Sequence, residues 1–508
     1  MLARAWTFAI DGIDSCPVSV EVDIRAGLPC FTIVGLGDAA VRESRERVRA
    51  ALLNCGFEFP QRRITANLAP AHLRKAGPGF DLALACGVLA ASGQLPAREL
   101  DGRALFAELS LSGDLRGCAG TLAVAEGAHG FGLRGLVVAR ERMGEAGLVD
   151  GIAVAGARTL IEVVGLLRGD SVIEGPGEPA AAAETSPGGP DLRDVLGHEV
   201  PIQALTIAAA GAHNLLLCGP PGTGKTMLAR RLPSILPGLS GPEAVEVTRI
   251  HSVAGQHDGN GLVRRRPFRA PHHSISASGL VGGGALPVPG EASLAHHGVL
   301  FLDELSEFSR GALESLRQPL EDGRVAIVRG QRTALYPTRF MLVASTNPCP
   351  CGYAGEGDRC RCTEADLARH RRRLSGPLLD RIDLLVAVGR PPAEHLSGRP
   401  FTTSACQAQR VAEARERRAH RQAVAAPGPD GRMDADAPGV GLRLDPRAEP
   451  LLREAYRHGT LSARGHHRVL GVARTIADLD ASAMVSRDHL LQALSLRQDA
   501  SSALHGGA

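Results

Sequence analysis

The sequence predicts an α/β fold with a parallel β-sheet at its centre, flanked by two further domains. Between residues 191 and 390, apolar runs with the composition of strands alternate with helical stretches, the pattern of a parallel sheet covered by helices. One of those runs, NLLLC at 214–218, leads directly into a glycine-rich loop and then a helix. The length of 508 residues is too great for a single core and suggests roughly three domains.

The first domain is expected over residues 1–172, where short apolar runs again alternate with helical stretches. Residues 29–36 and 64–70 have strand character, and residues 40–56 form an amphipathic helical pattern that stops at a glycine. The next segment, 173–190, is rich in Pro, Gly and Ala and has no periodicity. It is therefore expected to be a flexible linker.

The second domain is expected over 191–392 and the last one over 393–508. The last domain should be helical, with an Arg-rich helix at 408–421 and residues 443–497 helical throughout. A stretch rich in Gly, Pro and Asp, 425–441, separates these two helical parts.

The overall composition is that of an ordinary water-soluble protein, with 44% hydrophobic residues and a mean hydropathy of −0.01. Asp11 comes too early for the apolar core of a signal peptide, and no apolar run approaches the ~18 residues of a membrane span. We therefore expect a cytoplasmic protein without a membrane partner, in which clustered cysteines favour metal ligands or free thiols over disulfides. The net charge of +3 does not by itself indicate a nucleic-acid binder.

The loop that follows residue 218 has the pattern G-x-x-x-x-G-K-T, which predicts a site for ATP and Mg²⁺. Its glycines let backbone N–H groups surround the phosphates, its lysine reaches the outer phosphates, and its threonine hydroxyl ligates the metal. Lysine occurs only at positions 75 and 225, so the loop holds one of just two lysines in an Arg-rich chain. The residues of this loop are Gly219, Pro220, Pro221, Gly222, Thr223, Gly224, Lys225 and Thr226.

Two further apolar strands end in polar residues suited to the same site. GVLFLDEL ends in Asp303 and Glu304; the first could position Mg²⁺ and the second could activate the attacking water. The alternative is a pair of helix N-cap acids. RFMLVAST leads to Asn347, whose amide could orient that water, although an Asn after a strand is more often a turn residue.

Arg381 and Arg464 are the arginines that could complete a phosphate site, because a guanidinium placed against the transferred phosphate accelerates the reaction. Residue type alone favours plain surface arginines at both positions.

A cysteine cluster starts two residues after Asn347, with the spacing C-x-C-x8-C-x-C. The glycine-rich segment inside it could fold back and join the two C-x-C arms, so that four thiolates form a closed tetrahedral zinc site. Structural zinc sites more often use C-x2–4-C, and free thiols or a disulfide pair are the alternatives. The four residues are Cys349, Cys351, Cys360 and Cys362.

The segment between the phosphate loop and Asp303 is rich in Gly, Arg and His, and it is expected to form loops that project into the pore of a ring. Its arginines could follow a DNA backbone, or they could be a solvated basic face. The paired histidines 272–273 and 296–297 are expected to pack or form hydrogen bonds, because adjacent side chains point in different directions and suit a metal poorly. The arginines in question are Arg264, Arg265, Arg266 and Arg269.

Several long motifs resemble the YifB/ComM family of magnesium-chelatase-like AAA+ ATPases. They are the phosphate-loop segment 219–237, the stretch RPFRAPHH through LDEL at 266–305, STNPCPCG at 345–352, LSGPLLDRIDL at 374–384 and LSARGHHRVLGVARTIADL at 461–479. The resemblance implies Walker A at Gly219–Thr226, Walker B at Asp303 and Glu304, and sensor 1 at Asn347.

The same resemblance implies an arginine finger at Arg381 that acts on a neighbouring subunit's ATP, and a sensor-2 arginine at Arg464. A finger used in this way implies a ring, expected to be a hexamer. The expected activity is ATP hydrolysis coupled to DNA, as in a ring-shaped helicase or branch-migration motor of the ComM type. The alternatives are a chelatase-type motor subunit, which the fused N-terminal domain argues against, and a protein-remodelling ATPase.

The N-terminal part of this family resembles the proteolytic domain of Lon proteases, a ribosomal S5-like α+β fold, and the C-terminal part is a helical lid. In the stretch RKAGPGFDLALA, Gly79 stands where the Lon nucleophile Ser would be. After Lys75 no lysine occurs until Lys225, so the partner of the dyad is missing as well. We expect a binding or assembly module without peptidase activity.

Overall fold

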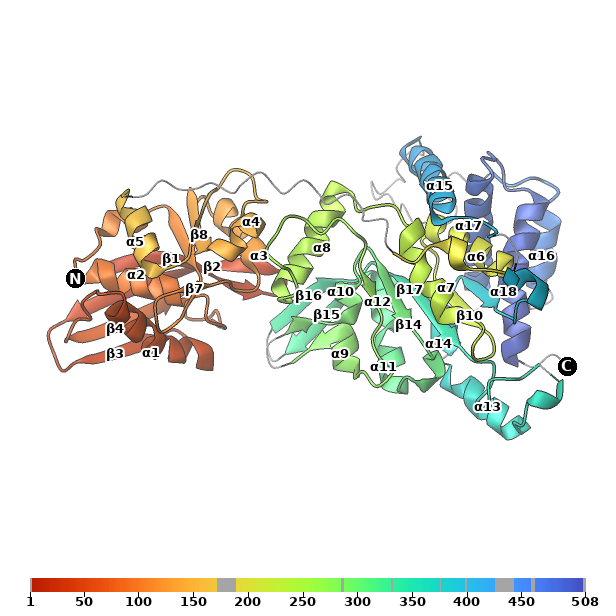
Figure 1. Ribbon diagram of the computed structural model, residues 1–508, viewed down its shortest axis with the longest axis horizontal. Coiled ribbons are helices and arrows are strands. Elements are labelled where there is room, and N and C mark those ends of the chain that lie inside the picture. Colours follow the sequence, from red (N-terminus) through yellow and green to blue (C-terminus); the bar gives the residue numbers. More distant parts are fainter. Residues whose placement is uncertain are drawn as a thin grey trace.

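The computed structural model describes residues 2–505, apart from 171–188, 285–286, 330–331, 356, 375, 398–399, 425–442 and 458–461. Along its longest axis an N-terminal sheet with its helices is followed by a central sheet and then by a group of C-terminal helices (Figure 1). The predicted linker 173–190 lies almost entirely outside the described residues, so the domain boundaries stay a prediction. Among the described helices, none is long and apolar enough to cross a membrane.

The N-terminal domain is built on a mixed seven-stranded sheet in the order β3-β4-β2-β1-β5-β8-β9. β2 pairs antiparallel with both β1 and β4, whereas the other neighbouring strands run parallel. The strands are β1 (Leu2–Asp11), β2 (Asp14–Arg25), β3 (Cys30–Val34), β4 (Arg63–Ala69), β5 (Arg103–Phe106), β8 (Gly135–Ala139) and β9 (Ala153–Ala157), with a small pair β6 (Glu108–Leu109) and β7 (Leu115–Arg116). The helices are α1 (Ala39–Asn54), α2 (Asp81–Ala91), α3 (Thr121–Gly130), α4 (Met143–Ala146) and α5 (Leu160–Arg168).

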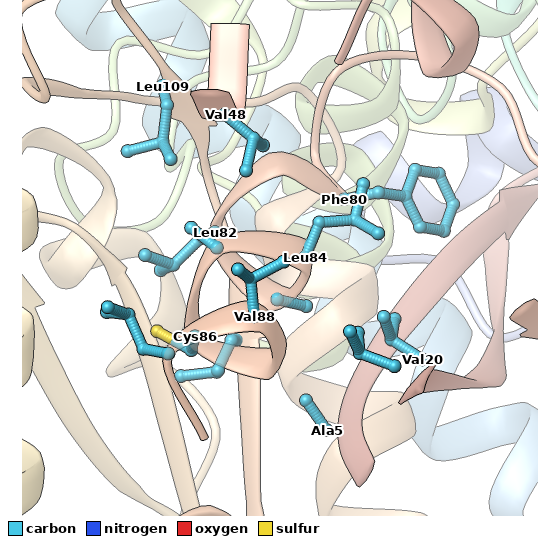
Figure 2. Close-up of a cluster of buried hydrophobic side chains, with 14 of the residues drawn as sticks. Ala5, Val20, Val48, Phe80, Leu82, Leu84, Cys86, Val88 and Leu109 are labelled. Carbon is cyan, nitrogen blue, oxygen red and sulfur yellow. The ribbon is translucent and has the colours of Figure 1, made fainter. Parts of the chain in front are cut away.

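Helix α2 forms the centre of this domain's core, because after Asp81 at its start its sequence is apolar around the whole circumference, and every one of its residues is buried. Figure 2 shows Leu84 and Val88 of α2 on the side of Val20 of β2 and Ala5 of β1, and Leu82 on the side of Val48 and Leu109. The strands predicted at 29–36 and 64–70 are β3 and β4, and the helix predicted at 40–56 is α1.

The central domain contains the predicted parallel sheet, in the order β11-β14-β17-β10-β18. Every neighbouring pair in it is parallel. The strands are β10 (Leu215–Cys218), β11 (Phe268–Arg269), β14 (Val299–Leu302), β17 (Met341–Thr346) and β18 (Leu384–Ala387). Every residue of β10, β14 and β17 is buried, as expected of strands covered on both faces.

Helices cover both faces of this sheet. Alternate residues of each strand enter two different cores, for example Leu215 and Leu217 on one side and Leu216 on the other. The helices are α6 (Glu199–Gly211), α7 (Lys225–Arg231), α8 (Gly241–Val253), α9 (Ala277–Val281), α10 (Glu291–Leu294), α11 (Arg310–Ser315), α12 (Arg317–Asp322), α13 (Glu364–Arg373) and α14 (Gly376–Leu379).

Two additional strand pairs lie outside the parallel sheet, and neither was predicted from the sequence. The longer is the antiparallel hairpin β15 (Arg324–Arg329) and β16 (Arg332–Pro337), and the shorter is β12 (Gly282–Gly283) with β13 (Val288–Pro289). The hairpin has its own small core around the fully buried Tyr336.

The C-terminal helices pack against α6 and β18 and share the core on that face of the central sheet. They are α15 (Ser404–Val424), α16 (Glu449–Arg457), α17 (Ala463–Leu479) and α18 (Arg487–His505). α15 contains the predicted Arg-rich helix 408–421. The segment predicted to be helical throughout begins instead with a short bridge between Leu444 and Val485, and α16 starts at Glu449.

Polar contacts join the N-terminal domain to α8 of the central domain. Arg249 pairs with Glu126 at 2.7 Å, and the Gly120 amide donates to the Ser252 carbonyl at 3.0 Å. The fully buried Glu145 on α4 accepts a hydrogen bond from the Ser252 hydroxyl. These contacts fix the N-terminal domain against the helix that leads into the Arg- and Gly-rich segment.

Candidate nucleotide site

The phosphate loop, the acids and Asn347 meet at one edge of the central sheet. β10, β17 and β14 are parallel neighbours, so the residues that follow them come out at the same edge. The structure therefore brings Lys225, Thr226, Asp303 and Asn347 together.

Lys225 is buried within the phosphate loop, and its side chain connects the loop to Asn347 by a hydrogen bond. Its Nζ donates to the carbonyls of Gly219 and Pro220 at 2.6 and 2.7 Å and to Oδ1 of Asn347 at 3.0 Å. Burial lowers the pKa of Lys225 below its ordinary value, against the opposing effect of the Asp303 and Glu304 carboxylates. Gly222 and Gly224 have φ of +77° and +85°, so the loop requires glycine at both positions.

Thr226 and Asp303 form the predicted metal pair. Oγ1 of Thr226 donates to Oδ2 of Asp303 at 2.8 Å. The other carboxylate oxygen accepts a hydrogen bond from Ser345, a residue at the end of β17 that the sequence did not single out. A hydroxyl and a carboxylate oxygen, held by a third hydroxyl, are hard oxygen ligands that suit Mg²⁺.

Glu304 follows Asp303 in a left-handed conformation, with φ of +54°. A non-glycine residue in that region is uncommon and is typical of functional sites. Its amide donates to Ser345 Oγ at 3.2 Å, while its side chain is 59% exposed. Nδ1 of His273 lies 3.8 Å from its carboxylate, a second neighbour that the sequence did not assign to the site.

These residues fit Mg–ATP. Lys225 and the loop amides would hold the phosphates, Thr226 and Asp303 would hold the metal, and Glu304 has an exposed carboxylate beside them.

Arg381 and Arg464 do not reach this cluster, because they lie at the opposite edge of the sheet. Asn214, which precedes β10, donates to the Arg381 carbonyl at 2.9 Å, whereas the phosphate loop follows β10 at its other end. The four residues of β10 separate the two ends by roughly 13 Å. Arg464 at the start of α17 lies beside Arg381, since both contact Glu321.

The four cysteines of the 349–362 segment do come together. Sγ of Cys349 lies 3.3 Å from that of Cys351 and 3.9 Å from that of Cys360. The four sulfur atoms, including that of Cys362, all lie within 4.8 Å of one another. Zinc–sulfur bonds of about 2.3 Å in a tetrahedron place sulfur atoms a little under 4 Å apart, so the set fits a structural zinc ion.

Residues next to the cysteine cluster in the chain contact the nucleotide site at two points. Nε2 of the buried His370 on α13 lies 2.9 Å from the Asn347 carbonyl. Gly352 lies against Pro221 of the phosphate loop, so closely that a Cβ there would meet Pro221 Cδ at 2.6 Å.

Of the four arginines proposed for DNA, two are engaged within the chain. Arg266 pairs with Glu243 at 3.0 Å and donates to the Pro237 and His297 carbonyls, and Arg269 forms a two-pronged pair with Glu291 at 2.7 and 2.8 Å. Arg264 and Arg265 are exposed. These two are therefore the most accessible of the four arginines.

The side chains of His296 and His297 converge, contrary to the prediction that adjacent histidines point in different directions. Their Nε2 atoms both lie 2.9 Å from one Glu246 oxygen, because His297 adopts a left-handed φ of +54°. Nδ1 of His296 accepts the Arg339 amide, so its proton lies on Nε2 and points at Glu246. That tautomer serves a hydrogen bond and not a metal, as expected of a structural role.

Gly79, at which the resemblance to Lon proteases places a serine, has little space for a side chain. A Cβ at Gly79 would meet the ring of Phe106 at 2.3 Å. Lys75 is fully buried and donates to the Pro70 carbonyl.

A parallel sheet with a phosphate loop after β10, acids after β14 and an asparagine after β17 defines a P-loop protein of the AAA+ class. Three family models match the chain: magnesium chelatase, subunit ChlI, over residues 191–396; subunit ChlI of Mg-chelatase over 20–142; and magnesium chelatase, subunit ChlI C-terminal, over 402–497.

Relatives match along nearly the whole length. An uncharacterized protein of Mycobacterium tuberculosis is 46% identical, covering 98% of this chain and 99% of its own. YifB of Escherichia coli is 44% identical and the competence protein ComM of Haemophilus influenzae 42%, each covering 98% of this chain and 97% of its own. The chain belongs to the YifB/ComM family of magnesium-chelatase-like AAA+ proteins.

One further relative matches only part of the chain. Lon protease 2 of Bacillus subtilis is 30% identical over 143 residues, which is 26% of this chain and 26% of that protein. The Lon-like resemblance of the fold is thus confirmed.

Proposed function

We propose that the protein hydrolyses Mg–ATP and uses the energy to act on DNA as a ring-shaped motor of the ComM type. The observation that carries the first half is the contact set at one edge of the central sheet, in which Lys225 binds Asn347 and Thr226 binds Asp303. The second half is supported by the 42% identity to a competence protein over 98% of the chain.

Each side chain has a defined task in this proposal. Lys225 binds the outer phosphates, Thr226 and Asp303 hold the metal, and Asn347 orients the attacking water. Glu304 accepts a proton from that water, because its exposed carboxylate follows directly after the metal ligand. The Mg²⁺ ion, when bound, neutralises charge that develops on the phosphates.

Arg381 and Arg464 complete the site from a neighbouring subunit. Their position at the edge opposite the phosphate loop supports this assignment, because neither can serve the ATP of its own chain. A subunit that presents ATP at one edge and arginines at the other joins copies head to tail and closes into a ring, which we propose to be a hexamer.

Variants separate these tasks. Lys225→Ala should abolish nucleotide binding, whereas Glu304→Gln should bind ATP and hardly hydrolyse it, which a fluorescent-nucleotide titration and a phosphate-release assay distinguish. Arg381→Ala should bind ATP normally and lose roughly 10³-fold or more in kcat.

Mixed assembly tests the action across subunits. Combining Arg381→Ala with Lys225→Ala subunits should restore part of the activity, since some interfaces then pair an intact phosphate loop with an intact arginine. Normal hydrolysis by Arg381→Ala alone would refute the finger assignment.

DNA-stimulated ATP hydrolysis is the test of the substrate. We expect DNA to raise kcat. Replacement of both Arg264 and Arg265 by Ala should weaken DNA binding, and it should reduce the slope of log affinity against log salt concentration by up to about two, since up to two phosphate contacts are lost. Arg266→Ala is the control, because the Arg266 guanidinium pairs with Glu243 within the chain. This variant should lower the stability of the protein and leave the salt dependence of DNA binding unchanged. Stimulation by an unfolded protein or a partner protein, and none by DNA, would favour a remodelling or chelatase-type motor.

A further inference from the structure

A basic cavity lies at the edge of the central sheet opposite the phosphate loop, between α12, α15 and α17. Its volume is about 660 Å³. Three carboxylates, Glu321, Asp383 and Asp478, face six arginines there. The arginines are Arg381, Arg418, Arg421, Arg464, Arg468 and Arg474.

Two of the three carboxylates are little exposed and have close ion-pair partners. Asp478 is buried between Arg474, at 2.9 Å, and Arg421, at 2.5 Å. Asp383 pairs with Arg468 and also accepts the Asn214 amide at 2.8 Å, with only 12% of its side chain exposed. These pairs tie α15, α17 and the start of β10 together, and they are part of the domain's structure.

Glu321 is different, because it is 47% exposed and its partners are the two arginines proposed to act on a neighbour's nucleotide. One atom, Oε1, contacts Nη2 of Arg381 and lies 3.8 Å from Nη2 of Arg464. Arg381 is 9% exposed, so its guanidinium has little freedom to turn elsewhere, whereas Arg464 is 68% exposed.

A single oxygen anion shared by two guanidiniums has the chemistry of a terminal phosphate oxygen. We infer that Glu321 is an internal placeholder for the γ-phosphate, which holds Arg381 and Arg464 in an ion-paired cluster until the phosphate of a neighbouring subunit's ATP displaces it. This inference rests on the proposed action across subunits.

Replacement of Glu321 by the γ-phosphate is favoured because the phosphate carries more negative charge. A half-exposed carboxylate with one negative charge forms a weak pair, whereas a triphosphate brings several charges to the same guanidiniums. Glu321 therefore raises the ATP concentration that the ring needs, while it keeps the arginines oriented in a subunit without a neighbour.

The test is the ATP dependence of hydrolysis and of assembly. Glu321→Gln keeps the shape and removes the competing charge, so the KM for ATP should fall roughly three- to ten-fold without loss of kcat. The concentration of a slowly hydrolysed ATP analogue that assembles the ring, followed by light scattering, should fall by a similar factor. Glu321→Asp, which keeps the charge, should stay close to the natural protein in both assays.

A matched control is Glu314→Gln on the adjacent α11. Glu314 is also a partly exposed acid that pairs with an arginine, Arg310, at 2.9 Å, and it lies outside the cavity. Its KM should not change. In an Arg381→Ala/Arg464→Ala background, Glu321→Gln should have no further effect, because the arginines that it releases are gone.

The outcomes distinguish the two proposals. An unchanged or raised KM in Glu321→Gln, with an unchanged melting temperature, overturns the placeholder role while leaving the finger in place. A loss of kcat in Glu321→Gln that Glu321→Asp restores would show that the charge orients the arginines for catalysis, which also overturns it. Failure of the action across subunits itself would appear as normal hydrolysis by Arg381→Ala.

Discussion

Gly352, which directly follows Cys351 of the cysteine cluster, lies against Pro221 of the phosphate loop. It has φ of +88°, and a methyl group there would meet Pro221 at 2.6 Å. Gly352→Ala should therefore displace Pro221 and raise the Kd for ATP several-fold, in addition to a backbone strain of about 1–2 kcal/mol. Titration with a fluorescent ATP analogue measures the change.

Gly355 is the matched control for this substitution. It has the same φ of +88°, but a Cβ there meets nothing within 4 Å. Gly355→Ala should carry a similar backbone strain and leave ATP affinity unchanged. Equal affinities in the two variants would contradict a coupling between the cluster and the loop.

The residues with fixed spacing in a motif could be placed from the sequence, whereas those that act through distant contacts could not. Lys225, Thr226 and Asp303 meet as expected. Ser345 was available as a polar residue at the end of an apolar strand, yet its partner Asp303 lies 42 positions away. No sequence pattern around Glu321 indicates a functional role, because that role depends on the position of α12 relative to α17 in the folded chain.

The segment from Cys349 to α13 connects Asn347 to the region of Arg381, and a bound zinc ion would fix its conformation. Purified protein should contain about one zinc per subunit, measured by atomic emission. Cys360→Ser/Cys362→Ser should lose the metal and lower the melting temperature by several degrees, because binding energy of the metal is part of the folding energy.

Cys406→Ser controls for thiol chemistry in general, since Cys406 is an exposed free cysteine at the start of α15. It should keep both the zinc and the melting temperature. A fully reduced protein that holds no metal and still hydrolyses ATP would rule out the zinc site.

Elements with strong periodicity were predictable and those with special pairings were not. The strands β3 and β4 and the helix α1 lie where their patterns place them. The hairpin β15–β16 was missed because RVAIVR contains the continuous apolar run VAIV, and a short apolar run of this kind fits an additional parallel strand equally well. The conformation of His297 could not be foreseen, since a left-handed histidine depends on the Arg339 and Glu246 contacts around it.

Two buried histidines should make the stability of the whole chain sensitive to acid. Burial lowers the pKa of His213 and of His296 to about 4. In the unfolded chain both take up a proton near pH 6.5, whereas in the folded chain they do so only near pH 4. The stabilisation is therefore complete above pH 6.5 and is lost between pH 6.5 and 4, by up to about 1.4 kcal/mol per pH unit for each histidine.

Thermal unfolding between pH 7.5 and 5 measures this effect. His213→Gln, which keeps a hydrogen-bonding group near Thr475, should flatten the pH dependence, whereas His420→Gln on the exposed face of α15 should not. His257, whose pKa is raised by its contact with Glu145 against the effect of burial, opposes the trend. A melting temperature that is independent of pH over this range would contradict the prediction.

Both lysines of the chain are hidden, Lys75 with 0% and Lys225 with 8% of its surface exposed. An endoprotease specific for lysine therefore finds no site on the folded protein, and each cut reports the opening of one region. Cleavage after Lys75 would follow unfolding of the N-terminal domain, and cleavage after Lys225 would follow opening of the phosphate loop, giving fragments 1–75, 76–225 and 226–508. ATP should slow cleavage after Lys225 and leave cleavage after Lys75 unchanged. The rates at which the two sets of fragments appear on a gel would therefore distinguish protection by the ligand from the stability of the N-terminal domain.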